Sequence, residues 1–173
     1  EVSEDTCQAL AGRILKVAEP LLAYDLLRFG LDKWPENTRL SQLFALTLAR
    51  TGAADSANSV VTSLYQSGHS DAETLGILAR THKDLWERST DLSAKQKHLD
   101  KACEIYRRAF MDALKSARTN DAIYTGINAA TTLMLRDKTD EAKDVAGQVR
   151  ELCVKKLEKE NDYWAMAAIA EAA

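Results

Sequence analysis

Apolar residues recur at every third or fourth position along most of the chain, and this spacing strongly limits the folds open to it. The clearest segment is residues 99–113, where the apolar residues are Leu99, Ala102, Cys103, Tyr106, Ala109, Phe110 and Ala113. This spacing places all of them on one face of an α-helix. No segment alternates convincingly between apolar and polar residues, as a half-buried strand would. The sequence therefore predicts an all-α protein.

Proline, glycine and short polar side chains mark where the helices begin and end. Pro20 suits the first turn of a helix, and Asn37 or Thr38 can cap the helix that follows it. Ser93 and Thr139 are also expected to be N-caps. Loops of mostly two to five residues imply that neighbouring helices pack antiparallel. These signals predict about nine helices, at residues 4–17, 20–33, 38–51, 54–67, 71–88, 94–116, 121–136, 140–159 and 162–172.

Alanines recur at an interval that is typical of one kind of helical repeat. A tetratricopeptide repeat is a helix–turn–helix unit of about 34 residues, with small residues where its two helices touch. Ala23 and Ala57 lie 34 positions apart, and each is followed four residues later by Leu27 or Val61. The pattern continues, with wider spacing, at Ala102 and Ala142 in second helices and at Ala11, Ala45, Ala79 and Ala130 in first helices.

An irregular helical bundle is the alternative to a stacked repeat. The repeat is favoured because one helix pair cannot bury its apolar stripe, whereas stacked pairs bury a continuous one. We therefore expect residues 1–173 to form a single domain, a right-handed α-solenoid of about four helix pairs plus one extra helix. The chain begins with Glu1, and we expect it to be a fragment of a longer protein.

Charge, hydropathy and cysteine spacing exclude several classes of function. The net charge is −3, so no global basic field exists to attract nucleic acid. No apolar run approaches the roughly 20 residues that a membrane span requires. Cys7, Cys103 and Cys153 are far apart and form no Cys-x-x-Cys motif. We therefore expect no nucleic-acid or membrane partner, no zinc site, and a reducing, cytoplasmic location.

Motifs for catalysis are missing from the sequence. Its three histidines form no metal-binding pair, and it contains no nucleophile elbow, phosphate-binding glycine loop or dinucleotide fingerprint. Cys103 and Cys153 lie on apolar stripes, so they are expected to be buried small hydrophobes rather than nucleophiles. His82 is most simply a helix-packing residue. We expect no enzyme activity, no catalytic residue, no cofactor and no metal.

A binding groove is a more plausible functional feature, because the first helices of stacked pairs line a concave side. Arg39, Arg50, Arg80 and Lys83 could form a basic patch there and bind an acidic or carboxylate-bearing peptide. The alternative is that they are ordinary solvated charges, paired with acidic residues such as Glu73. The full set of expected partner-binding residues is Gln8, Arg39, Gln42, Arg50, Arg80, Lys83, Tyr124 and Asn128.

Trp34, Trp86 and Trp164 each lie near an end of an expected helix, and Trp86 leads into the polar stretch that lengthens the third helix pair. Packing in the core or between helix pairs is the simpler interpretation, and an exposed anchor for another domain is the alternative. Residues 165–173 are apolar except for Glu171, with no further helix in this sequence to cover them. Such a surface is typical of contact with a partner or with more of the same chain.

Four stretches resemble a known family. They are LARTHKDLW (78–86), EIYRRAF (104–110), YTGINAATTLML (124–135) and DYWAMAAIAEA (162–172). In this order they resemble the tetratricopeptide-like TRAFs-binding region of the apoptosis signal-regulating kinases and, more closely, its bacterial relatives. The resemblance covers residues 71–173 and is weak before them. It implies a regulatory helical repeat inside a larger signalling protein, which binds other proteins and lacks catalysis.

The sequence therefore predicts a non-catalytic interaction module of a signalling protein, which binds a partner segment on its concave face. The alternative is a regulatory domain that senses a small molecule or nucleotide and controls an effector domain. A pocket where Arg80, Lys83 and Tyr124 converge would favour the sensor, and an open groove would favour the peptide.

Overall fold

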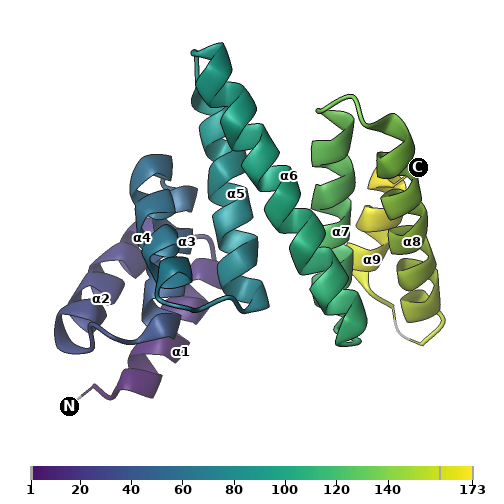
Figure 1. Cartoon of the computed structure of the whole chain (residues 1–173). Helices are drawn as coiled ribbons and strands as arrows, with labels where there is room; N and C mark the ends of the chain where they lie inside the picture. The colour runs from purple at the N-terminus through teal and green to yellow at the C-terminus, as the bar shows by residue number, and fades with distance from the viewer. Residues whose placement is uncertain (1, 160, 173) are drawn as a thin grey trace. The chain divides into compact units, whose positions relative to one another are not determined.

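The computed structural model describes residues 2–159 and 161–172, which form nine α-helices and no strand (Figure 1). The chain divides into two compact units, Glu1–Arg88 and Ser89–Ala173. Unit 1 contains α1 to α5 and unit 2 contains α6 to α9. The helices are α1 (Glu4–Lys16), α2 (Pro20–Lys33), α3 (Thr38–Arg50), α4 (Ala54–Gln66), α5 (Ala72–Arg88), α6 (Leu92–Lys115), α7 (Thr119–Met134), α8 (Thr139–Leu157) and α9 (Tyr163–Glu171).

The predicted helices are confirmed, with ends that differ by at most two residues. Asn37 caps α3 as predicted, because its side chain accepts a hydrogen bond from the Leu40 N–H. Two predicted caps are wrong. Asp91, not Ser93, caps α6, since α6 begins earlier than expected and the Asp91 carboxylate accepts from the Ala94 N–H at 2.7 Å. The N-cap position of α8 is Lys138, so Thr139 is already helical.

The alanines that define the predicted repeat are all buried in the structure. Ala23 belongs to a core cluster with Cys7 and Leu27, and Ala57 belongs to a second cluster with Leu48. Small side chains therefore lie where neighbouring helices pack closely, as the repeat requires. The eight positions are Ala11, Ala23, Ala45, Ala57, Ala79, Ala102, Ala130 and Ala142, with exposed fractions between 0% and 6%.

In unit 1, each helix packs on its neighbour in sequence, and first helices also contact one another: α1 packs on α3, and α3 on α5. A close approach occurs at Gly30 of α2, between α1 and α3. A Cβ atom there would lie 2.8 Å from Cys7 Sγ and 3.2 Å from Leu40 Cδ1. Because this space is too small for a methyl group, glycine is required for these helices to pack as they do.

In unit 2, α7 packs on α6, α8 and α9. Gly126 of α7 makes a close approach, since a Cβ atom there would lie 2.5 Å from Val149 Cγ2 and 2.7 Å from Phe110 Cε2. Phe110 and Val149 are themselves buried. The small residues of the GINAAT stretch thus let α7 lie close to α6 and α8 at once.

The boundary between the units falls between α5 and α6, two helices that the sequence assigns to the same pair. The expectation of one continuous domain over residues 1–173 stays a prediction.

Candidate binding site

The predicted partner-binding residues fall in both units: six lie on α1, α3 and α5 of unit 1, and Tyr124 and Asn128 lie on α7 of unit 2. In unit 1, Arg39 Nη1 lies 3.1 Å from Glu73 Oε1, which links α3 to α5. Gln42 is buried, and its amide nitrogen donates to Asp71 Oδ1 at 3.0 Å and to Thr74 Oγ1 at 2.9 Å. These contacts join first helices to each other.

The other predicted side chains of unit 1 also lie against their own chain. Arg50 Nη1 donates to the carbonyl oxygen of Leu15 at 2.7 Å, which links α3 to the end of α1. Arg80 Nε lies 3.8 Å from Asp84 Oδ2 on the same helix. Gln8 and Lys83 are half-buried. Their role in binding a partner stays a prediction, and so does a pocket shared by Arg80, Lys83 and Tyr124, since these lie in different units.

Asp71 stands at the centre of the polar contacts in unit 1. Burial raises the pKa of its carboxyl group, but hydrogen bonds from the Thr74 hydroxyl and from backbone N–H groups, including that of Glu73, outweigh burial and lower the pKa below its ordinary value. The carboxylate also accepts from Gln42. It therefore stays ionised at neutral pH and serves to hold α3 against the start of α5.

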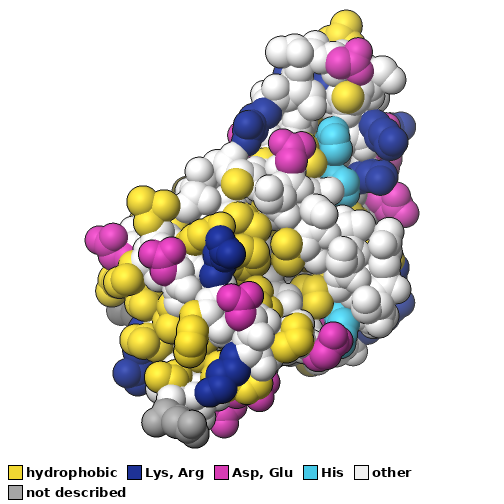
Figure 2. Space-filling model, turned by 90° about the vertical axis from the view of Figure 1, so that its left-hand side faces the viewer, with side chains coloured by type: hydrophobic (Ala, Val, Ile, Leu, Met, Phe, Trp, Pro, Cys, Tyr) yellow, Lys and Arg dark blue, Asp and Glu magenta, His cyan; other side chains and the backbone are white. Residues whose placement is uncertain are grey.

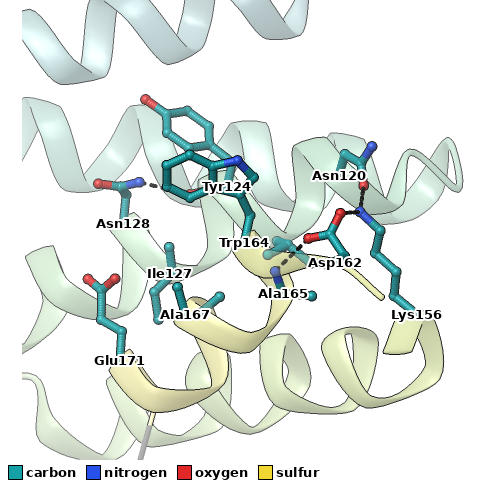
Figure 3. A pocket seen from close by; sticks show the side chains of 12 residues that line it. Asn120, Tyr124, Ile127, Asn128, Lys156, Asp162, Trp164, Ala165, Ala167 and Glu171 are labelled. Atoms are coloured by element: carbon teal, nitrogen blue, oxygen red, sulfur yellow. Dashed lines mark hydrogen bonds and ion pairs between the residues drawn. The ribbon is translucent and has the colours of Figure 1, made fainter. Parts of the chain in front are cut away.

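Unit 2 contains a hollow between α7 and α9, which we call the α7–α9 hollow (Figure 3). Its volume is about 490 Å³. The buried residues Ile123, Ile127, Ala165 and Ala168 form much of its wall. The complete lining is Asn120, Ile123, Tyr124, Ile127, Asn128, Lys156, Asp162, Trp164, Ala165, Ala167, Ala168 and Glu171.

Two exposed aromatic side chains line the α7–α9 hollow. Trp164 is 76% exposed and Tyr124 is 47% exposed. The Tyr124 ring packs edge-on against Tyr106 of α6, with centroids 6.4 Å apart, and the Asn128 amide donates to the Tyr124 carbonyl at 2.8 Å. Tyr124 is thus held in place, while Trp164 presents most of its indole to solvent.

A polar cluster closes one end of the α7–α9 hollow (Figure 3). Lys156 Nζ donates to Asn120 Oδ1 at 2.6 Å and to Asp162 Oδ2 at 2.7 Å. Asp162 caps α9 by accepting from the Ala165 N–H at 2.7 Å. The hydrogen bond from Lys156, and then that from Ala165, lower the pKa of Asp162. This cluster ties α7, the end of α8 and the start of α9 together.

Sequence reasoning missed the polar cluster. Asn120 and Lys156 are 36 positions apart, and neither belongs to a motif. Asp162 before an apolar run was a usable signal, because it is the pattern of an N-cap. Of the three tryptophans near helix ends, Trp164 is 76% exposed, which agrees with an exposed anchor, whereas Trp34 and Trp86 are half-buried, which agrees with packing.

The cysteines do not form a reactive site. All three are buried, and burial raises the pKa of the Cys7 and Cys153 thiols. The Cys7 and Cys153 thiols therefore stay protonated at neutral pH. The burial of Cys103 and Cys153 agrees with their predicted role as small hydrophobes. His82 is buried within α5, as predicted.

Over residues 2–159 and 161–172, no group of three or more His, Cys, Asp or Glu side chains could hold a metal ion. Within the same part of the chain, no helix has the length and apolar character needed to cross a bilayer.

Helix pairs joined by short turns, with small residues at their contacts, define a tetratricopeptide-type helical repeat. The structure is similar to that of a thermophilic TPR protein from Thermus thermophilus, with a TM-score of 0.71 over 98% of this chain and 90% of that chain, at 15% identity. The model of the family described as Tetratricopeptide Repeats-Sensor matches residues 21–134. The chain belongs to this family. Among curated proteins, no sequence matches it significantly.

Proposed function

We propose that the chain is a non-catalytic interaction module of a signalling protein, and that it holds a segment of a partner protein in the α7–α9 hollow. The observation that carries the proposal is the hollow itself, with apolar walls and the exposed Trp164 and Tyr124 at its opening. Exposed aromatic side chains around an apolar pocket are typical of residues that dominate binding energy at protein interfaces. Tetratricopeptide repeats generally act as scaffolds rather than catalysts, which supports the same proposal.

The chemistry of the hollow favours a segment that inserts an apolar side chain. Its walls offer Ile123, Ile127 and three alanines, and polar groups occur mainly at its ends. The Lys156 ammonium is already bonded to Asp162, so little free charge faces the centre of the hollow. The hollow lies between α7 and α9, both first helices of their pairs, the side on which sequence reasoning placed the partner. The resemblance to the TRAFs-binding region supports the signalling context and, with it, a cytoplasmic location.

A phage-displayed peptide library tests this proposal. Peptides selected on the whole chain are measured by calorimetry against the parent and against Trp164→Ala. We expect at least a tenfold loss of affinity, because truncation of a central interface tryptophan typically costs about 2 kcal/mol or more. Met166→Ala is the matched control, since Met166 is 49% exposed on the same helix but does not line the hollow, whereas the Tyr163 ring contacts that of Trp164. Selected peptides that bind Trp164→Ala as well as the parent would contradict the proposal.

A second candidate function is the sensing of a small molecule that controls an effector domain. Two observations favour it: the volume of about 490 Å³ lies within the range of ligand pockets, and the family is described as a sensor. Native mass spectrometry of the purified chain, after incubation with a cell metabolite extract, distinguishes the candidates. A discrete mass increase that Trp164→Ala abolishes supports the sensor, and unchanged mass with peptide binding supports the interaction module.

A further inference from the structure

A second hollow adjoins the first at the polar cluster of unit 2, and we call it the lysine hollow. Its volume is about 390 Å³. The two hollows share Asn120 and Lys156. The described residues that line it include three lysines and no acidic residue: Thr119, Asn120, Leu152, Lys155, Lys156 and Lys159.

The cations of the lysine hollow differ in whether they are already paired. Lys156 is bonded to Asp162 and Asn120. No ion pair links Lys155 or Lys159 to another described residue, and both are exposed. Two ammonium groups are therefore available on one side of the hollow, in a chain whose net charge is −3.

Neutral donors complement the two lysines. The oxygen of the Asn120 amide accepts from Lys156, and Figure 3 shows the amide nitrogen pointing away from that ammonium. Thr119 also lines the hollow, and its side chain carries a hydroxyl donor. An oxyanion bound here would receive hydrogen bonds from ammonium, amide and hydroxyl groups, and bonds from charged donors to an oxyanion are the stronger kind.

The dipole of α8 explains only part of the clustering of lysines and neutral donors around the lysine hollow. Lys155 and Lys156 lie in the last turn of α8, where cations interact favourably with the helix dipole. Lys159 lies beyond the end of α8, and the dipole does not account for donors from α7 on the other side of the hollow.

We propose that the lysine hollow binds an anionic group, either phosphoryl or carboxylate. The sequence placed an acidic partner on Arg39, Arg50, Arg80 and Lys83, but those arginines contact their own chain, so we assign anion binding to Lys155 and Lys159 instead. Because the hollows adjoin, one ligand can place its apolar part in the α7–α9 hollow and its anionic group in the lysine hollow. The placement of an apolar part in the α7–α9 hollow rests on the proposed function, whereas anion binding in the lysine hollow does not.

The test is a titration of the ¹⁵N-labelled whole chain with pyrophosphate and, separately, with glutarate at constant ionic strength. We expect saturable amide shifts that cluster at Thr119, Asn120 and the end of α8 with at least one of the two probes. Saturation by pyrophosphate alone identifies a phosphoryl site, and saturation by glutarate alone identifies a carboxylate site. No saturable shift with either probe, or weak shifts spread over all lysines, overturns the proposal.

Matched variants make the test specific. Lys155→Gln with Lys159→Gln should weaken binding about fivefold or more, because two charged donors are lost. Lys143→Gln with Arg150→Gln removes the same charge from exposed positions of α8 outside the lysine hollow, and should leave binding unchanged. Equal weakening by both pairs would show a general charge effect and overturn the proposal. Trp164→Ala should not alter pyrophosphate binding, so a failure of the proposed function remains distinguishable.

Discussion

In unit 1, polar side chains of the first helices bond to neighbouring first helices, whereas in unit 2 the space between α7 and α9 is a hollow. Arg39 and Gln42 reach from α3 to α5, and Arg50 reaches from α3 to α1. Between α7 and α9, among the side chains that the structure describes, Thr131 donates a long hydrogen bond of 3.4 Å to Glu171.

The difference between the two units follows from side-chain size. Helix α9 faces the hollow mainly through alanines, among them Ala165, Ala167 and Ala168. Ala165 and Ala168 pack in one core cluster with Ile123 and Ile127 of α7, but such short side chains leave a hollow beside that contact. On α3, by contrast, long side chains such as Gln42 fill the equivalent space and satisfy buried polar groups. The same arrangement of helix pairs therefore gives polar contacts between first helices in unit 1 and an open hollow in unit 2.

Unit 1 also has an exposed apolar surface, formed by α1, α2 and the turn between them. Figure 2 shows hydrophobic side chains gathered on this face, with charged side chains among them. Its large exposed members are Leu10, Val17, Leu21, Leu22 and Phe29. Apolar surfaces of this kind mark interaction sites.

The largest expected effect comes from filling a close helix contact in each unit. Gly126→Ala should lower the free energy of unfolding by about 2–3 kcal/mol, because its methyl group would overlap two buried side chains. Gly30→Ala should cost less, about 1–2 kcal/mol, since its nearest neighbour lies at 2.8 Å. Urea unfolding followed by circular dichroism measures both.

Gly147→Ala and Gly12→Ala are the controls for these two variants, one in each unit. An added Cβ atom meets nothing within 4 Å at either position. Because alanine favours helix more than glycine, each should stabilise the chain by about 0.5–1 kcal/mol. If all four substitutions had the same effect, close packing at Gly126 and Gly30 would be refuted.

The next largest effect is expected at the polar contacts between the first helices of unit 1. Gln42→Leu keeps roughly the same size but removes the N–H donor to Asp71 and Thr74, which should cost about 1–3 kcal/mol. Gln66→Leu, at an exposed position of α4, should change stability by less than about 0.5 kcal/mol. The urea midpoints of unfolding of the two variants measure this difference. An unchanged midpoint for Gln42→Leu would show that these hydrogen bonds do not contribute to stability.

A fall in pH should have a smaller effect on the stability of the fold. The pKa of Asp71 is lower in the folded chain than in the unfolded chain, so its ionised form stabilises the fold above pH about 4. That contribution is lost as pH falls through the folded pKa. The urea midpoint should therefore decrease between pH 5 and 3, and Asp71→Asn should decrease less steeply. Parallel slopes for parent and variant would remove Asp71 as a source of acid sensitivity.

The smallest effect on stability is expected in the hollow of unit 2. Trp164→Ala should change the free energy of unfolding by less than about 0.5 kcal/mol, because the side chain is 76% exposed and α9 packs through Ala165 and Ala168. Thermal unfolding measures this directly. A marked loss of stability would mean that Trp164 serves packing, and it would weaken the interface interpretation.

Part of the candidate site could be predicted from the sequence. Tyr124 and Asn128 were expected on the binding side, and both line the α7–α9 hollow. Their positions follow from helical periodicity, which fixes the face on which a residue lies. The contacts of Arg39 and Arg50 could not be predicted, because a long flexible side chain bonds to whichever acceptor a distant segment brings near it.

The sequence by itself determined the helices and the burial of their alanines. These depend on caps, turns and apolar spacing, which act within a few residues of each other. Ser93 and Thr139 show the limit of such signals, since several short polar residues near a helix start compete for the cap. Only the tertiary structure decided which polar side chains bond to their own chain and where a hollow remains. The hollow exists because the alanines of α9 are short, and Asn120, Lys156 and Asp162 meet at one end of it. No local pattern encodes that meeting.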